Sequence, residues 1–470
     1  MTDMSSVWKA LGGDPALVSR VSTVVRRETL GARLPVRGLA RTCVAACSLA
    51  AAELGARRAG LAEVPGVRVD DEAVEAAFHS ERLLRIDGRA PVAFAPLSRF
   101  WRTADGWVRT HANYPHHRRR LLDALELPAD ASVERVAAAL TGRNAVEVEE
   151  GVYGAGGLAI AVRTPAQWAA HEQAAEVARR PLVERATTGA AHARVLPPLA
   201  ASPLLPAAGL RVLDLTRVIA GPVGTRTLAL LGADVLRVDA PSLPELPDQH
   251  ADTGFGKRSA TLDLGTDRET FEDLLARADV VVTGYRPGAL DRFGLDPRAL
   301  AERRPGLVVA QVSAWGAYGP WGGRRGFDSL VQAATGIAVC EGPAGQPGAL
   351  PAQALDHGTG YLLAAAVLRA LTERTYDGRG RSVRLALART AAWLTGGAER
   401  DTAPDDAPAG AVHEGPALRL AERDGPLGHL RYAPPAVSFT DGPLDWVQPP
   451  GPWGTDAPRW DREPGADAPL

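Results

Sequence analysis

The chain has 470 residues, of which 46% are hydrophobic and 23% are charged, a composition typical of a soluble globular protein with roughly two to four domains. Its formal net charge of -2 and pI of 6.6 exclude a strongly basic surface, so we expect neither nucleic acid nor an anionic membrane as a partner. Three cysteines without a CxxC pair exclude a disulfide framework, and no metal site is expected. We also find no signal-peptide pattern and no apolar run of the ~18–20 residues that span a bilayer, which predicts a cytoplasmic protein.

The N-terminal part of the chain contains a faint internal repeat. Residues 38–78 align without gaps to residues 354–393 and their flank, with Ala40 opposite Asp356. We therefore predict that residues 1–90 are a degenerate helical and sheet remnant of a first copy, which has lost the carboxylate. A chance similarity between two alanine-rich helices is the alternative.

Clusters of proline and glycine predict where the remaining units begin and end. We expect a small α/β domain, a linker, a sheet domain, a second linker and an extended C-terminal tail, over residues 91–195, 196–208, 209–395, 396–415 and 416–470.

Strand and helix patterns alternate through the sheet domain. The expected strands cover residues 211–216, 234–239, 260–264, 280–283, 307–313 and 381–387. This alternation predicts an α/β fold, namely a Rossmann-like, doubly wound parallel sheet. Ligands bind such sheets at the carboxyl ends of the strands, so we expect the site in the loops after Thr216, Asp239, Thr283 and Ser313.

The loop after the first of these strands does not favour a dinucleotide. It has the sequence RVIAGPVGTRT and lacks the glycine pattern that lets a pyrophosphate approach the backbone. Asp239 could serve as a ribose-binding acid, but a single carboxylate at a strand end is weak support. NAD is therefore disfavoured.

Five motifs in the sheet domain keep a common order and spacing: VLDLTRVIAGPVGTRTLALLGADVLRVDAP, GKRSATLDL, ADVVVTGYRPGALDRFGL, RRGFDSLVQAATG and ALDHGTGYLLAAAVLRAL. In the order and spacing of these motifs, residues 209–395 resemble the family III CoA-transferases. This family includes the carnitine-CoA transferases and the α-methylacyl-CoA racemases. Residues 94–113 and 162–171 resemble the small domain of that family, here placed before the sheet domain. The resemblance implies the family III fold in a fused, rearranged form.

The resemblance implies that Asp356 is the catalytic nucleophile, which attacks an acyl-CoA to give an anhydride and then an aspartyl-CoA thioester. Asp356 follows an apolar run and opens an apolar helix, where backbone N–H groups favour an anion. Taken without the motifs around it, the same residue could be a simple N-cap.

The resemblance also implies a set of residues around coenzyme A, which would be a substrate rather than a permanently bound cofactor. Two positions depart from the family pattern, because Gly256 and Gly284 replace side-chain amides. Lys257 is one of only two lysines among 53 basic residues, which we interpret as a retained phosphate ligand. The implied CoA-binding residues are Val218, Ile219, Ala220, Lys257, Arg258, Tyr285, Arg286, Arg292 and Arg325.

The sequence thus favours an acyl-CoA:carboxylate CoA-transferase. A racemase on the same fold is disfavoured, because Phe327 stands where its histidine would be and His357 points some 100° away from Asp356 along the helix. A degenerate, non-catalytic CoA-binding protein is the other alternative. His116 and His117 are interpreted as a solvated helix face. The expected partners are small-molecule acyl-CoA and carboxylate substrates and, by resemblance, a second copy in a homodimer.

Overall fold

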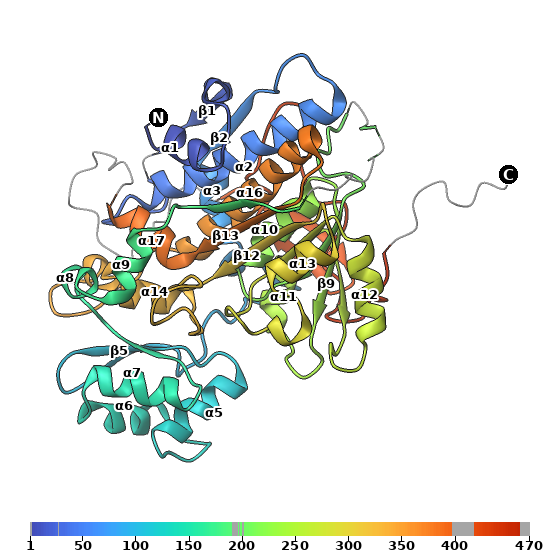
Figure 1. Cartoon of the computed structure of the whole chain (residues 1–470). Helices are drawn as coiled ribbons and strands as arrows, with labels where there is room; N and C mark the ends of the chain where they lie inside the picture. Colours follow the sequence, from blue (N-terminus) through green and yellow to red (C-terminus); the bar gives the residue numbers. More distant parts are fainter. Residues whose placement is uncertain are drawn as a thin grey trace.

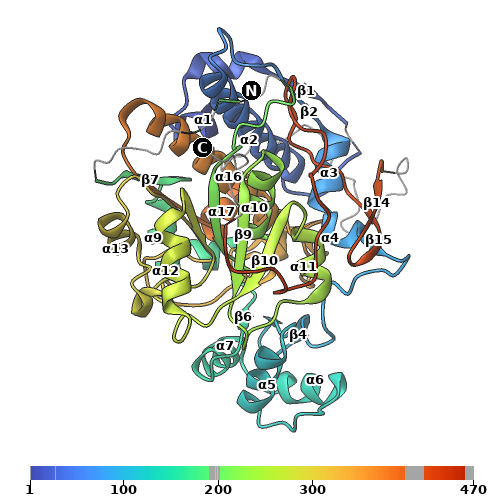
Figure 2. The same cartoon turned by 90° about the vertical axis from the view of Figure 1, so that its right-hand side faces the viewer.

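The computed structural model describes residues 2–26, 28–189, 196, 198–199, 202–396 and 418–460. Within them, the largest element is a seven-stranded sheet of order β10-β9-β8-β11-β12-β13-β7 (Figures 1 and 2). Its strands are β7 (Glu184–Thr187), β8 (Arg211–Leu215), β9 (Asp234–Asp239), β10 (Lys257–Thr261), β11 (Val280–Thr283), β12 (Val308–Ser313) and β13 (Arg381–Ala386).

All pairings in this sheet are parallel except that of β7 with β13. Strand order reverses between β8 and β11, as in a doubly wound Rossmann-like sheet, so the predicted α/β fold is confirmed. Because β7 extends this sheet, the predicted small domain does not continue to residue 195.

Both faces of the sheet are apolar because helices cover both. Val212, Val280 and Val308 pack on one face, and Leu213 and Val281 on the other. The helices of this half are α10 (Ala220–Leu230), α11 (Pro247–Thr253), α12 (Arg268–Arg277), η2 (Asp291–Phe293), α13 (Pro297–Arg303), α14 (Asp328–Ala334), α15 (Ile337–Glu341), α16 (Ala354–Asp377) and α17 (Leu387–Gly396).

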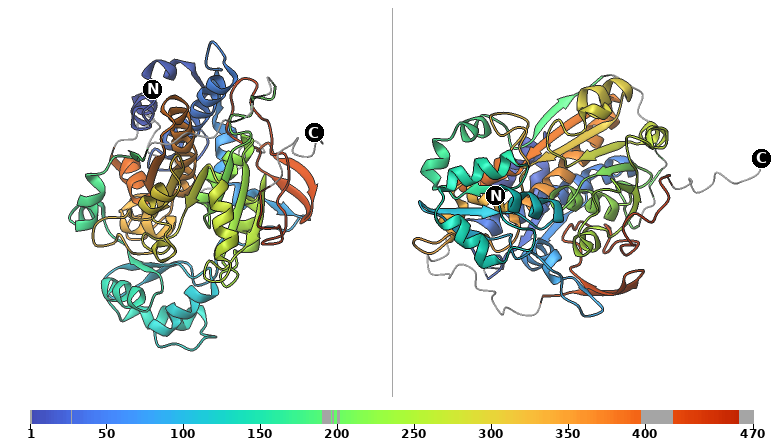
Figure 3. Two further views of the ribbon diagram at one scale, coloured as in Figure 1. Left: turned by 45° about the vertical axis from the view of Figure 1, so that its right-hand side comes forward. Right: turned by 90° about the horizontal axis from the view of Figure 1, so that it is seen from below.

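The N-terminal unit lies against α16. It comprises α1 (Thr2–Ala10), η1 (Pro15–Arg20), β1 (Val21–Val24), α2 (Val36–Ala59), β2 (Val67–Asp70), α3 (Asp71–Phe78), α4 (Ser80–Leu83) and β3 (Arg85–Ile86). Helices α2 and α16 run side by side through the core (Figure 3, left). Contrary to our expectation from the sequence, α2 is apolar and long enough to cross a membrane, but 89% of its most apolar window is buried in the protein. It is therefore a core helix here.

A smaller unit with its own core lies below the large sheet (Figures 1 and 3). It contains the antiparallel strands β4 (Phe100–Arg102), β5 (Trp107–Thr110) and β6 (Ala159–Ala161), with α5 (Pro115–Ala124), α6 (Val133–Thr141) and α7 (Ala145–Gly154). Helices α8 (Pro165–Ala169) and α9 (Glu172–Ala178) then lead back to the large sheet.

The C-terminal segment forms a hairpin, β14 (Ala421–Gly425) and β15 (Gly428–Tyr432), which pairs with β3. It then runs without regular structure over the large sheet domain (Figure 2). Buried Trp446 and Trp460 fix it there, since their Nε1 atoms donate to the carbonyls of Arg226 and Leu274, each at 3.0 Å. Of the two predicted linkers, residues 197, 200–201 and 397–415 lie outside the described residues.

Candidate active site

A cavity of about 940 Å³ opens at the carboxyl ends of the parallel strands. Each of the six parallel strands is followed by a residue of its wall: Arg217, Ala240, Asp263, Tyr285, Ala314 and Leu387. The small unit closes the opposite side with Tyr114, His116, His117, Arg119 and Arg120. The loops in which the sequence predicted a site therefore do meet in one cavity, at the switch point of the sheet.

Asp356 lines this cavity from the first turn of α16 and is 6% exposed. Its backbone N–H donates to Oδ2 of Asp328 at 2.9 Å, while Oδ1 of Asp328 accepts from Gln332 at 2.5 Å. The N-cap position belongs to Gln353. Asp356 is therefore not an N-cap residue, although it lies in the first turn of the helix.

The electrostatic surroundings of Asp356 oppose its ionisation. Burial raises the pKa of this carboxyl well above its usual value, and the negative charges of Asp328 and Glu81 raise it further. Burial also raises the pKa of Asp328 to about 6, against hydrogen bonds from Gln332 and the backbone. We expected the helix N-terminus to favour an anion here, but burial and two neighbouring acids outweigh it.

His357 turns away from the cavity into the N-terminal unit. It is fully buried, its Nε2 lies 3.0 Å from Oε2 of Glu81, and its ring stacks on Phe78 at 5.3 Å. Although burial opposes ionisation of Glu81, the hydrogen bond and charge of His357 lower the pKa of Glu81. Residues of the N-terminal unit thus contact the helix turn that carries Asp356. No sequence motif indicated this contact.

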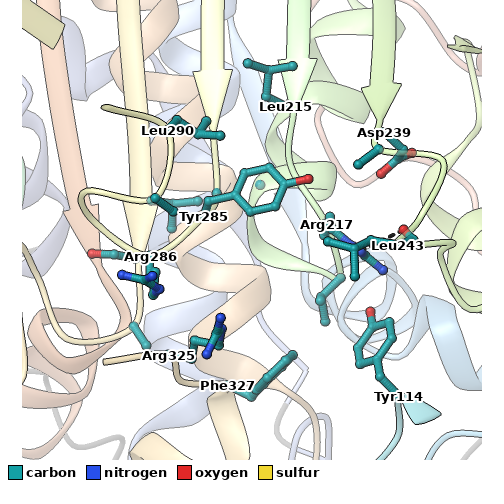
Figure 4. A pocket seen from close by; sticks show the side chains of 18 of the residues that line it. Tyr114, Leu215, Arg217, Asp239, Leu243, Tyr285, Arg286, Leu290, Arg325 and Phe327 are labelled. Carbon is teal, nitrogen blue, oxygen red and sulfur yellow. Dashed lines mark hydrogen bonds between the residues drawn. The ribbon is translucent and has the colours of Figure 1, made fainter. Parts of the chain in front are cut away.

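The cavity brings together six of the nine candidate CoA-binding residues. These are Val218, Ala220, Tyr285, Arg286, Arg292 and Arg325. Figure 4 shows Tyr285, Arg286 and Arg325 among them. Ile219 is buried as the N-cap residue of α10 and does not line the cavity.

Lys257 and Arg258 are not placed to bind a phosphate. Nζ of buried Lys257 lies within 3.0 Å of Asp214 Oδ2, the carbonyl of Pro222 and Thr225 Oγ1. Arg258 donates to Asp234 Oδ1 at 2.6 Å and likewise does not line the cavity. Both residues begin β10, so they lie at the amino end of a strand whose carboxyl end borders the cavity.

The missing amide at position 256 has a local cause. Gly256 has a φ of +73°, and a Cβ at this position would lie 2.9 Å from the Trp446 ring. The C-terminal segment therefore fills the space into which a side chain at position 256 would extend.

The loop after β8 is strained and held by a buried network. Val218 has a φ of +72°, a genuine outlier for a β-branched residue. Its N–H donates to Glu245 at 3.0 Å, and Glu245 also accepts from Arg237 at 2.9 Å and from the Tyr114 hydroxyl at 2.5 Å. Asp239 is likewise bound by Arg237, at 2.7 Å, so it is part of this network rather than a free ribose ligand. Sequence patterns gave no sign of Glu245 or Tyr114.

Two arginines face the cavity from adjacent loops (Figure 4). Within the described residues, neither Arg286 nor Arg325 has an ion-pair partner. Burial lowers the pKa of Arg325, and the charges of Arg286 and Arg120 lower it further. Cations that repel one another around a cavity are suited to binding an anion. The described residues contain no group of three potential metal ligands.

The fold and the cavity define an α/β protein of the doubly wound class with a cavity at the switch point. Residues 207–417 match the model of CoA-transferase family III. These residues are therefore similar to that family, and the resemblance that the motifs predicted is confirmed.

Named relatives agree with this assignment. The chain is 36% identical over 202 residues to a probable fatty acyl-CoA transferase, Rv3272, of Mycobacterium tuberculosis, covering 40% of this chain and 51% of that one. It is 37% identical over 193 residues to a formyl-CoA:oxalate CoA-transferase of Streptomyces coelicolor, covering 38% and 47%. The chain thus spans about half the length of the curated relatives it matches.

Solved structures with related sequences include a crystal structure of Rv3272, which is 35% identical and has a TM-score of 0.37 over 40% of this chain and 56% of that chain. A CAIB/BAIF family protein from Brucella suis is 28% identical, with a TM-score of 0.37 over 48% and 65% of the two chains.

Proposed function

We propose that this protein transfers CoA between an acyl-CoA and a carboxylic acid, with Asp356 as the nucleophile. The observation that carries the proposal is the position of Asp356, a carboxylate in the switch-point cavity of a family III CoA-transferase region.

In the proposed reaction, Oδ of ionised Asp356 attacks the thioester carbonyl and the C–S bond breaks, giving a mixed anhydride and CoA thiolate. The thiolate attacks the aspartyl carbonyl, which releases the donor acid as a carboxylate and leaves an aspartyl-CoA thioester. The acceptor carboxylate attacks this thioester and expels the thiolate, which then attacks the acceptor carbonyl. The new acyl-CoA leaves and the Asp356 carboxylate is restored.

The cavity residues have separate parts in this proposal. Arg286, Arg292 and Arg325 bind the phosphates of CoA, because a guanidinium matches phosphate geometry. Tyr285 contacts the adenine, and the backbone of Val218 and Ala220 borders the ligand. The buried Glu245 network supports this role by fixing the strained loop at Val218.

Trapping the intermediate tests the nucleophile. Incubation with an acyl-CoA and hydroxylamine, followed by mass spectrometry, is expected to give a hydroxamate at Asp356. Asp356→Ala is expected to lose exchange and labelling. Asp263→Ala, which removes another acid of the same cavity wall, is expected to keep both. Normal turnover by the Asp356→Ala protein would refute the assignment.

Two rival functions remain to be distinguished. A racemase is disfavoured because Phe327 carries no proton and buried His357 binds Glu81. Deuterium exchange at the α-carbon of a 2-methylacyl-CoA would support it. A non-catalytic CoA-binding protein is favoured by the raised pKa of Asp356 and the loss of Lys257 as a phosphate ligand. It would bind CoA esters without exchange, whatever acid is offered.

We also propose that the chain contains an internal duplication. Helices α2 and α16 both have 24 residues and both end at a glycine with φ near +67°, Gly60 and Gly378. Each is followed by a strand that passes directly into a helix: β2 into α3, and β13 into α17. Matching the helix ends places Gly38, rather than Ala40, opposite Asp356. A close backbone superposition of residues 36–78 on 354–396 supports the duplication, and failure of the two strands to coincide opposes it.

The homodimer stays a prediction, for which sedimentation velocity is the test. A single species at the mass of one chain would refute it.

A further inference from the structure

One part of the cavity wall near Asp356 is aromatic and comes from both units of the protein. Phe327 lines the cavity and immediately precedes Asp328, whose carboxylate accepts the backbone N–H of Asp356. The ring of Phe327 projects toward the cavity beside Arg325 (Figure 4). Phe327 and Asp356 therefore line the same cavity.

The Phe327 ring is held in place from the small unit. Its centroid lies 3.7 Å from that of the His111 ring, with the two planes only 7° apart. His111 is 4% exposed, and its backbone N–H donates to the carbonyl of Leu158 at 3.1 Å. Tyr114 and His117 approach the same ring, with centroids 6.4 and 5.9 Å away. Turning Phe327 aside would break its stack on buried His111, so this wall resists displacement.

The histidines of this cluster are neutral. Burial lowers the pKa of His111 to about 3 and that of His117 to about 2, and neighbouring histidines or arginines lower them further. The interpretation of His117 as part of a solvated helix face was therefore wrong, because it is 5% exposed and packs against this cluster. Neutral rings offer an apolar surface rather than a charge for an anion.

Other residues of the cavity wall are aliphatic. Val312 near the end of β12, Ala314 after β12 and Leu387 after β13 line the cavity. Gly326 packs so tightly that a Cβ on it would lie 2.5 Å from the Cβ of Ala314. A second carboxylate on the acyl group would also enter the negative field of Asp328 and Glu81, which already acts on Asp356.

We propose that Phe327, held by His111, limits the length of the acyl group at this site, and that the site selects compact, apolar, monocarboxylic acyl groups. This inference rests on the proposed CoA-transferase function and names its substrate class. A longer chain would have to displace the aromatic wall, and a dicarboxylic acyl group would place an anion beside two acids.

The test compares binding of acetyl-, butyryl-, octanoyl- and succinyl-CoA to the full-length protein by calorimetry, together with kcat/KM for exchange. We expect butyryl-CoA to bind at least about 10-fold more tightly than octanoyl- or succinyl-CoA. Phe327→Ala is expected to raise the affinity for octanoyl-CoA, relative to that for butyryl-CoA, by at least about 10-fold. The affinity for succinyl-CoA is not expected to rise. His111→Phe keeps a stacked ring and is expected to keep the wild-type preference.

Two further variants keep the result interpretable. Phe327→Leu replaces Phe327→Ala if the alanine variant does not fold, and a smaller change in the same direction is expected. Phe293 lines the same cavity on η2, so Phe293→Ala should change affinity for all esters by a similar factor. This inference, but not the proposed function, would be overturned by a Phe327 variant that changes the affinity for all esters by the same factor. Tight binding of succinyl-CoA by the wild type would overturn it as well. Failure to bind CoA and every ester would overturn the proposed function instead.

Discussion

Replacement of Lys257 separates a structural role from a ligand-binding role. The side chains of Lys257 and Asp214 are 2% and 0% exposed, and Nζ lies 3.0 Å from Oδ2. Burial opposes ionisation of Asp214, but Lys257 and Arg237 together with two hydroxyl groups lower its pKa. The pair is therefore ionic in the folded protein, and Lys257→Met would leave a buried carboxylate without its main counter-charge.

Breaking a buried pair in this way costs about 3–5 kcal/mol. We therefore expect urea unfolding of Lys257→Met to show a loss of stability in that range. The double variant Lys257→Met/Asp214→Leu removes both charges and should regain most of the loss, because no unpaired charge is left in the core.

Ligand binding provides the contrasting measurement. A lysine that contacts a phosphate contributes about 1.5–3 kcal/mol, so its loss would weaken CoA binding by at least about 10-fold. We expect the affinity of folded Lys257→Met for CoA to stay within about twofold of wild type. A variant of normal stability that loses CoA affinity by 10-fold or more would refute the structural role.

Three other variants probe the site and its surroundings. Asp356→Asn should stabilise the protein at pH 7.5. Because the pKa of Asp356 is raised in the folded state, the carboxyl ionises first in the unfolded state, and the wild type loses stability as the pH rises above about 4. Thermal scans should therefore show that the stability gained by the variant vanishes near pH 4. Arg286→Ala and Arg325→Ala should each weaken CoA binding about 10-fold and reduce its salt dependence, whereas calorimetry of Arg298→Ala, which removes an exposed arginine, should give the wild-type result. Trp446→Ala should cost about 3–5 kcal/mol in urea unfolding, and an unchanged midpoint would contradict the role of the C-terminal segment in the core.

The sheet could be predicted because it depends on local pattern, whereas Asp356 was indicated by the resemblance of its motif to a known family. Apolar runs between helices specify a parallel sheet, and a parallel sheet determines the edge at which loops such as the one containing Tyr285 meet. The rule that ligands bind at the carboxyl ends of parallel strands could also have shown that Lys257 lies away from the cavity. Lys257 starts a strand, and the four residues to Thr261 at about 3.3 Å each place it roughly 13 Å from the ligand edge.

Other features of the site depend on contacts between residues far apart in the sequence. The bond from Tyr114 to Glu245 joins the small unit to the sheet domain over 131 positions, and the stack of His111 on Phe327 joins the same two units. Neither pair has a spacing that a pattern could indicate. The raised pKa of Asp356 is of the same kind, because it arises from burial and from acids on two other helices.

The N-terminal unit lies outside the family match, yet it completes the site of the family region. Gly358, two residues after Asp356, packs so closely on α2 that a Cβ there would lie 2.9 Å from Leu39. Glu81 reaches the neighbouring His357 at 3.0 Å. The start of α16 is therefore covered by α2 and lies beside the acidic side chain of Glu81. Both come from residues outside the family match. Under the proposed duplication, the first copy has no carboxylate of its own at the matching position and instead packs against the helix that carries Asp356.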